Sequence, residues 1–269
     1  MKESIFVKKT EAFLKKLDID FLKKSFVFDD LDSTNMTAKD LAKTGAEEGT
    51  VVIARTQSHG RGRFERSWES PEGGVYLSLI LRPGVSCEKT PLLPFVVALA
   101  VTKTINTYRI HASIKWPNDV RVNGRKIAGI LLESEGDGLT INYVVVGIGI
   151  NLAVDLKRLS AEIQARSTSL LDELHHPVDY YEFLKTFFIS FEHYYEIFQK
   201  QGYAKIIDEW KAHSDTLGKN VRVKTMTETL QGTAFDVDQS GFLLLWTASG
   251  ETKKILSGDC LYFDELDHT

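Results

Sequence analysis

Arginine and glycine alternate in residues 57–68, where the side chains are suited to binding an anion. The stretch reads Gln-Ser-His-Gly-Arg-Gly-Arg-Phe-Glu-Arg-Ser-Trp, and we call it the Gly-Arg loop. Glycine lets the backbone approach a ligand closely, and arginine donates paired hydrogen bonds to carboxylate and phosphate oxygens. The loop is therefore a candidate site for a phosphate-bearing ligand. A solvated basic turn and an RGG-type nucleic-acid contact are the alternatives that this composition leaves open.

Four further segments combine polar side chains with glycines in a way that suits a ligand site. Each has a simpler explanation when taken alone. Ser33 can cap a helix, Asn118-Asp119 can end a strand, and Gly147-Ile148-Gly149 can form a bulge without the rest of a dinucleotide-binding fingerprint. The four segments are Asp32-Ser33-Thr34-Asn35, Lys115-Trp116-Pro117-Asn118-Asp119, Arg125-Lys126-Ile127-Ala128-Gly129-Ile130-Leu131 and Val146-Gly147-Ile148-Gly149-Ile150-Asn151.

In this order and together, the five segments resemble the motifs of the biotin protein ligase family, the biotin–[acetyl-CoA-carboxylase] ligases. The resemblance extends over about residues 30–265 and is densest over 33–151. It implies that biotin attacks the α-phosphate of ATP to give biotinyl-5′-AMP and pyrophosphate. A lysine of a carrier domain then attacks this mixed anhydride and releases AMP. The implied co-substrate and ion are ATP and Mg²⁺, and the implied partner is the biotin carboxyl carrier domain of acetyl-CoA carboxylase or a related carboxylase.

The resemblance also implies roles for individual residues. Three residues correspond to catalytic residues of the family: Lys126, Arg63 and Lys115. Of these, Lys126 corresponds to the lysine that contacts the reacting carboxylate and α-phosphate. Asp119 is the candidate Mg²⁺ contact. The implied ATP-binding residues are Arg63, Arg66, Asn118 and Asn151. The implied biotin-binding residues are Ser33, Thr34, Asn35, Gln57, Gly60, Arg61, Gly62, Arg63, Trp68, Lys126, Gly129, Gly147 and Gly149.

The elements that must position these residues follow from the apolar periodicity. We expect strands at 25–31, 50–56, 74–81 and 113–116, then a β-meander with turns at Asn123-Gly124 and 136–138 that ends at 150. We expect helices at 33–43, 92–108, 178–199 and 203–213, and one or two short amphipathic helices within 5–24. The aromatic stripe of 178–199 is predicted to be core. Short strands at 221–225, 231–237, 242–246 and 253–256 predict a small barrel.

These elements predict an α+β fold, with a mixed, largely antiparallel sheet and helices rather than a doubly wound one. The family resemblance implies a class II synthetase-like catalytic domain followed by an SH3-like β-barrel. The predicted division is a helical extension at 1–25, a catalytic domain at 26–217 and the C-terminal domain at 218–269. Residues 1–25 are too few for the DNA-binding domain that some family members carry.

The composition restricts the class of protein. The 269 residues are 43% hydrophobic and 26% charged, with a net charge of −4, which argues against broad nucleic-acid binding. Two cysteines, Cys87 and Cys260, make no disulfide framework and are expected to be buried or partly buried thiols. The longest apolar run, 95–101, is too short to span a bilayer. We therefore expect a cytoplasmic protein without membrane or nucleic-acid partners, and a homodimer stays open.

Three other functions compete with biotin ligation. A lipoate or octanoate ligase shares the fold and chemistry, but its usual Arg-Arg-x-Ser-Gly-Gly-Gly loop is replaced here by Gly-Arg-Gly-Arg. A ligand-sensing repressor would need a DNA-binding domain and a different charge. A non-catalytic phosphate-binding module would not need Lys115, Lys126 and Asn151 together.

Overall fold

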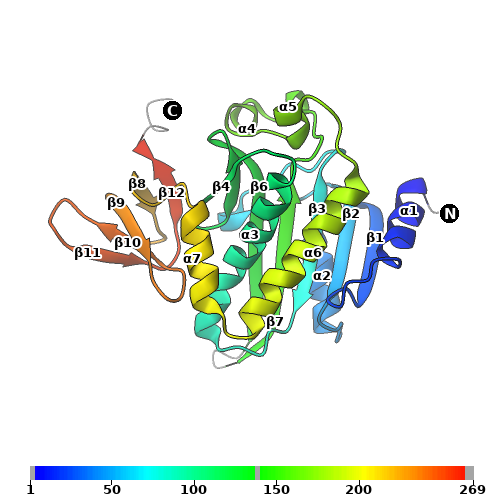
Figure 1. Ribbon diagram of the computed structural model, residues 1–269, viewed down its shortest axis with the longest axis horizontal. Helices are drawn as coiled ribbons and strands as arrows, with labels where there is room; N and C mark the ends of the chain where they lie inside the picture. Colours follow the sequence, from blue (N-terminus) through cyan, green and yellow to red (C-terminus); the bar gives the residue numbers. More distant parts are fainter. Residues whose placement is uncertain (1–3, 137–139, 264–269) are drawn as a thin grey trace.

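A seven-stranded sheet forms the centre of the computed structural model, which describes residues 4–136 and 140–263 (Figure 1). Its strand order is β1-β2-β3-β7-β6-β5-β4. Strands β1 and β2 pair in parallel, and the other neighbouring pairs are antiparallel, which confirms the predicted mixed sheet. The strands are β1 (Lys24–Leu31), β2 (Thr50–Gln57), β3 (Val75–Leu81), β4 (Ala112–Lys115), β5 (Asp119–Val122), β6 (Arg125–Gly136) and β7 (Ile141–Ile150).

Both faces of this sheet are covered. Helices α3 (Leu93–Asn106), α6 (Tyr180–Gln199) and α7 (Tyr203–His213) cover one face, and α2 (Thr34–Lys43) packs on the other (Figure 1). Strand β3 shows the alternation that this requires: Leu79 faces the α3–α6 side, whereas Ile80 faces α2. Because the side chains on both faces of β3 are buried, the strand is apolar along its length apart from Ser78.

The predicted helices occur close to their expected ranges. The aromatic stripe of α6 is core, as predicted, with Phe187 and Phe191 fully buried. The single described helix of the N-terminal segment, α1 (Ile5–Leu14), packs beside β1. Two short helices that were not predicted, α4 (Ala161–Arg166) and α5 (Leu170–Leu174), follow β7. The expected turn at 136–138 lies mostly outside the described residues.

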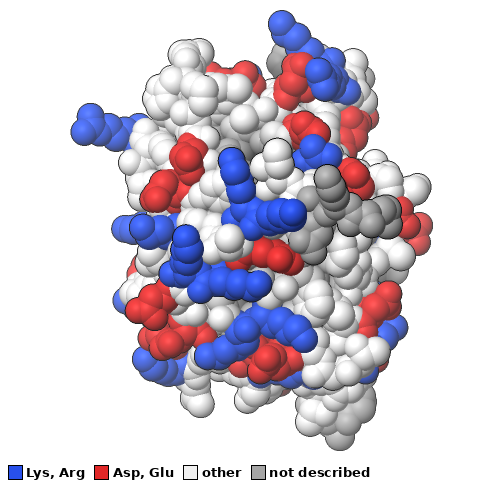
Figure 2. All heavy atoms as spheres, turned by 90° about the vertical axis from the view of Figure 1, so that its right-hand side faces the viewer, with Lys and Arg blue, Asp and Glu red and all other residues white. Residues whose placement is uncertain are grey.

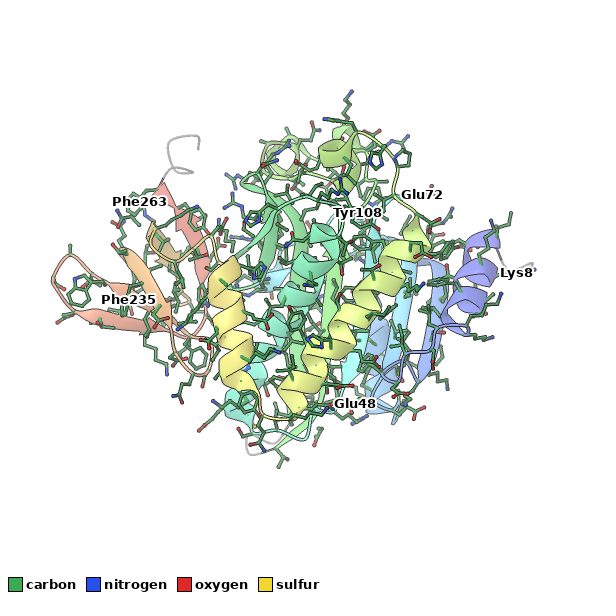
Figure 3. The ribbon with its side chains drawn as sticks, in the orientation of Figure 1. Lys8, Glu48, Glu72, Tyr108, Phe235 and Phe263 are labelled. Atoms are coloured by element: carbon green, nitrogen blue, oxygen red, sulfur yellow. The ribbon has the colours of Figure 1, made fainter. Side chains whose placement is uncertain are left out.

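A separate five-stranded sheet follows α7, in the order β11-β10-β9-β8-β12. Phe235 and Phe263 mark this sheet at one end of the molecule, and Lys8 of α1 lies at the other end (Figure 3). The last strand, β12, was not among the strands that the sequence predicted. The strands are β8 (Asn220–Lys224), β9 (Thr229–Val237), β10 (Leu243–Trp246), β11 (Thr252–Ile255) and β12 (Asp259–Tyr262).

The two sheets meet at the Lys-Trp-Pro-Asn-Asp segment. Trp116 is 2% exposed; its indole Nε1 donates to the carbonyl of Gly241 (3.1 Å), and its backbone N–H donates to Thr216 Oγ1 (2.9 Å). The ring of Tyr262 lies 4.3 Å from Lys115 Nζ. The sequence predicted catalytic and ligand-binding residues in this segment. In the structure the same segment also joins the C-terminal sheet to the larger one.

Surface and cysteine features agree with the composition. On the face that carries α1 and β1, lysines and arginines are interspersed with acidic side chains (Figure 2). Cys87 is half-buried and Cys260 is buried, and the two do not form a disulfide, as expected. Among the described residues, no helix has the length and apolar character needed to cross a membrane.

Candidate active site

Most of the predicted site residues line one cavity. The N-terminus of α2, the end of β2, the Gly-Arg loop, and strands β6 and β7 contribute to it, and they come from segments up to 116 residues apart in sequence. Asp259 of the C-terminal sheet completes the lining. The predicted residues that line the cavity are Ser33, Thr34, Asn35, Gln57, Arg61, Gly62, Arg63, Arg66, Trp68, Asn118, Asp119, Lys126, Gly129, Gly147 and Gly149.

One end of the cavity is a neutral polar pocket at the N-terminus of α2. The Gln57 side-chain oxygen accepts from the Thr34 backbone N–H (2.8 Å), and its amide nitrogen donates to Ser70 Oγ (2.8 Å). Ser33 occupies the N-cap position without a side-chain cap hydrogen bond. If Ser33 served only as a helix cap, its hydroxyl would accept a hydrogen bond from the backbone of the helix. It accepts none, so the hydroxyl is not used by the helix. Short hydroxyls and an amide in fixed positions suit a rigid ligand with paired donors and acceptors.

Ser78 lies beneath this pocket and was missed by the sequence reasoning. It is fully buried in the middle of β3, and its hydroxyl lies 2.8 Å from Thr34 Oγ1 and 2.6 Å from Asn35 Oδ1. Asn35 is also buried, and its amide nitrogen donates to Glu133 Oε2 (3.0 Å). The only sequence signal for Ser78 is a polar residue inside an otherwise apolar strand.

The glycines of β6 and β7 make room for protein side chains that line the cavity. A Cβ at Gly129 or Gly149 would come within 2.7 and 2.5 Å of the Trp68 indole, and one at Gly147 would come within 2.0 Å of Asn35 Oδ1. Glycine is thus required at Gly129 and Gly149 so that Trp68 can pack against the sheet, and at Gly147 so that Asn35 can do the same. Within the cavity Trp68 presents an apolar wall, and its buried indole N–H has no hydrogen-bond partner among the described residues.

Arg63 connects the Gly-Arg loop to the C-terminal sheet. Its guanidinium donates to Ser257 Oγ (2.7 Å), to the carbonyl of Gly258 (3.1 Å) and to Asn118 Oδ1 (3.3 Å). Burial lowers the pKa of Arg63, while the charges of Asp119 and Asp259 oppose that shift. Because the ordinary value is far above neutral, Arg63 still carries a full positive charge at the cavity wall.

A second arginine of the loop makes a two-point contact with the same sheet. Both terminal nitrogens of Arg66 donate to Asp259, at 3.3 and 2.5 Å. The hydrogen bond to Asp259 raises the pKa of Arg66. Paired contacts of this kind hold the plane of a guanidinium group and would suit a phosphate equally well.

Lys126 and Asp119 lie next to the loop arginines and face each other across the β5–β6 pair. Lys126 Nζ lies 2.7 Å from Asp119 Oδ1 and 5.2 Å from the centre of the Trp68 ring. Asn118 is fixed beside them, because its amide nitrogen donates to the carbonyl of Ile130 (2.6 Å). A cation, a carboxylate and an amide thus lie together next to the apolar wall formed by Trp68.

Three predicted site residues lie outside the lining of this cavity. Gly60 lies in the loop, where a Cβ would come within 2.3 Å of the Trp68 carbonyl. The Lys115 side chain contacts the Tyr262 ring. Asn151 is 4% exposed, and its amide nitrogen donates to the carbonyl of Thr168 (3.0 Å). These positions favour a supporting role for the three residues, and their predicted direct roles stay predictions.

Comparison with known proteins agrees with this geometry. Residues 27–151 match the biotin/lipoate A/B protein ligase family, and residues 216–261 match the biotin protein ligase C-terminal domain. The chain is 39% identical to the bifunctional ligase/repressor BirA of Bacillus subtilis over 86% of this chain and 71% of that protein. It is 38% identical to a biotin–[acetyl-CoA-carboxylase] ligase of Paracoccus denitrificans over 81% and 92% of the two chains.

A solved structure supports the same assignment at the level of the fold. The biotin protein ligase of Aquifex aeolicus, determined in complex with biotin and ATP, superposes with a TM-score of 0.76 at 29% identity. The match covers 89% of this chain and 98% of that one. The chain belongs to the biotin protein ligase family.

Proposed function

We propose that this protein ligates biotin to a lysine of a carrier domain through biotinyl-5′-AMP. The observation that carries the proposal is the order of groups along one cavity. A neutral polar pocket at Thr34 and Gln57 is followed by the Trp68 wall and then by Lys126, Asp119 and Arg63. Biotin has the same order, with a ureido ring, an apolar body and a terminal carboxylate. The carboxylate would therefore lie among the cations that bind phosphate.

The reaction requires two anions to approach each other, and fixed cations lower that cost. In our proposal Lys126 neutralises charge on the reacting carboxylate and α-phosphate, and Arg63 and Arg66 bind the nucleotide phosphates with help from Asn118. Each of these cations is already held by a neighbour in the structure. Their positions are therefore largely set before the ligands bind, which favours electrostatic stabilisation of the transition state.

The donor set also fits Mg²⁺ that is bound mainly by phosphate oxygens and water. Asp119 and Asp259 are the carboxylates that line the cavity, and among the described residues no group of three or more His, Cys, Asp or Glu side chains could hold a metal. Asp119 would be the protein contact of the ion. When bound, Mg²⁺ would reduce the negative charge on the leaving pyrophosphate.

The acceptor follows from the names of the relatives and stays part of the proposal. The Paracoccus relative is named for acetyl-CoA carboxylase, so we expect the biotin carboxyl carrier domain of that enzyme or of a related carboxylase to supply the lysine. The need for ATP and two cysteines that are not disulfide-bonded suit the cytoplasm. We expect neither a membrane nor a nucleic-acid partner, and a homodimer is compatible with this reaction.

Intact-mass spectrometry of an apo carrier domain tests the proposal. The carrier is incubated with enzyme and ATP, together with either biotin or lipoate. We expect one biotinyl group to be added to a single lysine, and no addition without ATP. Addition of lipoyl in preference to biotinyl would instead assign the cavity to lipoate ligation. A lysine-to-arginine carrier is the matched control.

A further inference from the structure

Glu133 of β6 contacts both α2 and the Gly-Arg loop, although it does not line the cavity. One carboxylate oxygen lies 2.9 Å from Lys39 Nζ of α2 and 3.3 Å from Arg61 Nη1 of the Gly-Arg loop. The other oxygen accepts from the Asn35 amide at 3.0 Å. The Glu133 side chain is only 18% exposed, so little water competes for these contacts. A single carboxylate therefore holds both the loop and the α2 pocket.

The contact with Glu133 fixes which end of the Asn35 amide faces the protein interior. A carboxylate only accepts hydrogen bonds, so the Asn35 nitrogen must face Glu133 and the Asn35 oxygen must face Ser78. That oxygen also only accepts, and therefore Ser78 uses its one hydroxyl hydrogen on Asn35. The amide orientation is thus set by the charge on Glu133.

Counting donors and acceptors in the same way gives the direction of the hydrogen bond between Ser78 and Thr34. With its hydrogen used, the Ser78 oxygen can only accept from the Thr34 hydroxyl, 2.8 Å away. Gln57 Oε1, which accepts from the Thr34 backbone N–H at 2.8 Å, lies farther from the same hydroxyl, at 3.1 Å, and with either acceptor the Thr34 hydrogen is used within the protein. The Thr34 hydroxyl consequently presents lone pairs, and not a hydrogen, to the cavity.

We propose that Glu133 is a positioning residue for biotin: through Asn35 and Ser78 it makes Thr34 a hydrogen-bond acceptor, and through Arg61 it anchors the Gly-Arg loop over the same ligand. A ureido N–H requires such an acceptor. The proposal rests on the proposed function for the identity of the ligand. It assigns Glu133 to the binding and retention of biotin and leaves the chemistry at phosphorus to Lys126 and the loop cations.

The test compares Glu133→Gln with Glu135→Gln. The Glu133→Gln substitution keeps the size of the side chain but removes the ion pair with Arg61. It also introduces an amide group that can donate a hydrogen bond to Asn35. The Asn35 side-chain amide is then no longer held in one orientation and can flip. We expect the Kd of biotin, measured by calorimetry without ATP, to rise about tenfold, the scale of losing hydrogen bonds to one charged group. The KM for ATP should change less than twofold. Glu135 lies on the same strand and accepts from Tyr143 (2.8 Å), and its variant should bind biotin as the wild type does.

A double-mutant cycle separates positioning from a general loss of structure. Arg61→Gln and Glu133→Gln should together weaken biotin binding by clearly less than the product of their separate effects, because each removes the same ion pair. Ser78→Ala, a smaller change, should weaken biotin binding several-fold even if Glu133→Gln folds poorly. Multiplicative effects in the cycle, or wild-type affinity in both Glu133→Gln and Ser78→Ala, would overturn the proposal. Wild-type biotin binding without any ligation would instead count against the ligase reaction alone.

Discussion

At the scale of single residues, Lys126 carries the strongest chemical prediction. It lies on a strand, pairs with Asp119 at 2.7 Å and borders the Trp68 wall. A lysine on the surface of the hairpin would have neither the ion pair nor the contact with Trp68. Because the ammonium group is held in advance, its charge can act on the transition state without reorganisation.

We expect Lys126→Ala to slow biotin-dependent adenylation by about 10²–10³, the scale of losing one preorganised electrostatic contact. Lys126→Gln should restore little activity, because it keeps length but not charge. Stopped-flow or exchange kinetics would measure the rate, and calorimetry would show that biotin affinity falls much less. Wild-type kinetics in a folded Lys126→Ala enzyme would exclude the catalytic role.

The pH dependence of stability provides a second residue-scale prediction, at Glu133. Burial alone would raise the pKa of Glu133, but hydrogen bonds from Lys39 and Asn35, together with the charge of Arg61, outweigh it and hold the pKa below the ordinary value of 4.5. A depressed pKa in the folded state contributes stability above the unfolded value, and this contribution is lost as the pH falls through the folded value.

Urea unfolding of the wild type and Glu133→Gln from pH 7 downward measures this effect. The wild type should be the more stable at pH 7, and its advantage should persist to about pH 4.5 and shrink below it. A difference in unfolding free energy that stays constant to about pH 3.5 would mean that the Glu133 charge does not stabilise the fold. Glu135→Gln is the matched control on the same strand.

At the scale of elements, three arginines connect the Gly-Arg loop to β6 and to the C-terminal sheet. Its central residues Phe64 and Glu65 adopt left-handed backbone angles (φ 54° and 59°), which cost non-glycine residues about 1 kcal/mol or more each. Contacts of Arg61 with Glu133, Arg63 with the 257–258 segment and Arg66 with Asp259 offset this cost. Loss of one contact should therefore loosen the whole loop.

We expect Arg63→Ala to release biotinyl-5′-AMP as well as to slow its synthesis. The residue is proposed both to bind phosphate and to hold the loop closed, so its loss should let the anhydride escape and label lysines on a bystander protein such as albumin. The ratio of bystander labelling to adenylate synthesis should rise at least several-fold. Arg55→Ala, just before the loop on β2, should leave that ratio unchanged. A parallel fall of both quantities in Arg63→Ala would contradict the covering role.

The elements differ in how far sequence predicts them. The Asn123-Gly124 hairpin was predicted correctly, because both residues adopt the positive φ angles (50° and 76°) that a type I′ turn requires. Helices α4 and α5 were missed, since they are too short to show a helical periodicity. Ser78 and Glu133 were missed because their partners are distant: Asn35 is 98 residues from Glu133, and no local pattern records that contact.

At the scale of the whole molecule, the C-terminal sheet is part of the site. It provides Asp259 and the 257–258 segment to the loop arginines, and its strand β12 lies on the side that faces the larger sheet (Figure 1). The Tyr262 hydroxyl lies 2.5 Å from Asp215 and 2.8 Å from Thr216, and its ring contacts Lys115. The sequence predicted both sheets, but not that they meet over the cavity.

Tyr262→Phe should therefore weaken this junction. The ring and its contacts with the lysines are retained, but two hydrogen bonds are lost, so we expect the free energy of unfolding to fall by about 1–3 kcal/mol. Hydrogen exchange should show faster opening of β12 and of the Gly-Arg loop together. Faster exchange in β12 with an unchanged loop would indicate that the C-terminal sheet does not hold the loop.

In the proposed reaction, one cavity binds biotin and ATP so that the biotin carboxylate attacks the α-phosphate. Exchange of labelled pyrophosphate into ATP, with no carrier present, tests it most directly, since this exchange requires only the first half-reaction. We predict exchange that depends on biotin and is lost in Lys126→Ala. Exchange supported by lipoate but not by biotin, or no exchange in an enzyme that binds both ligands, would contradict the account.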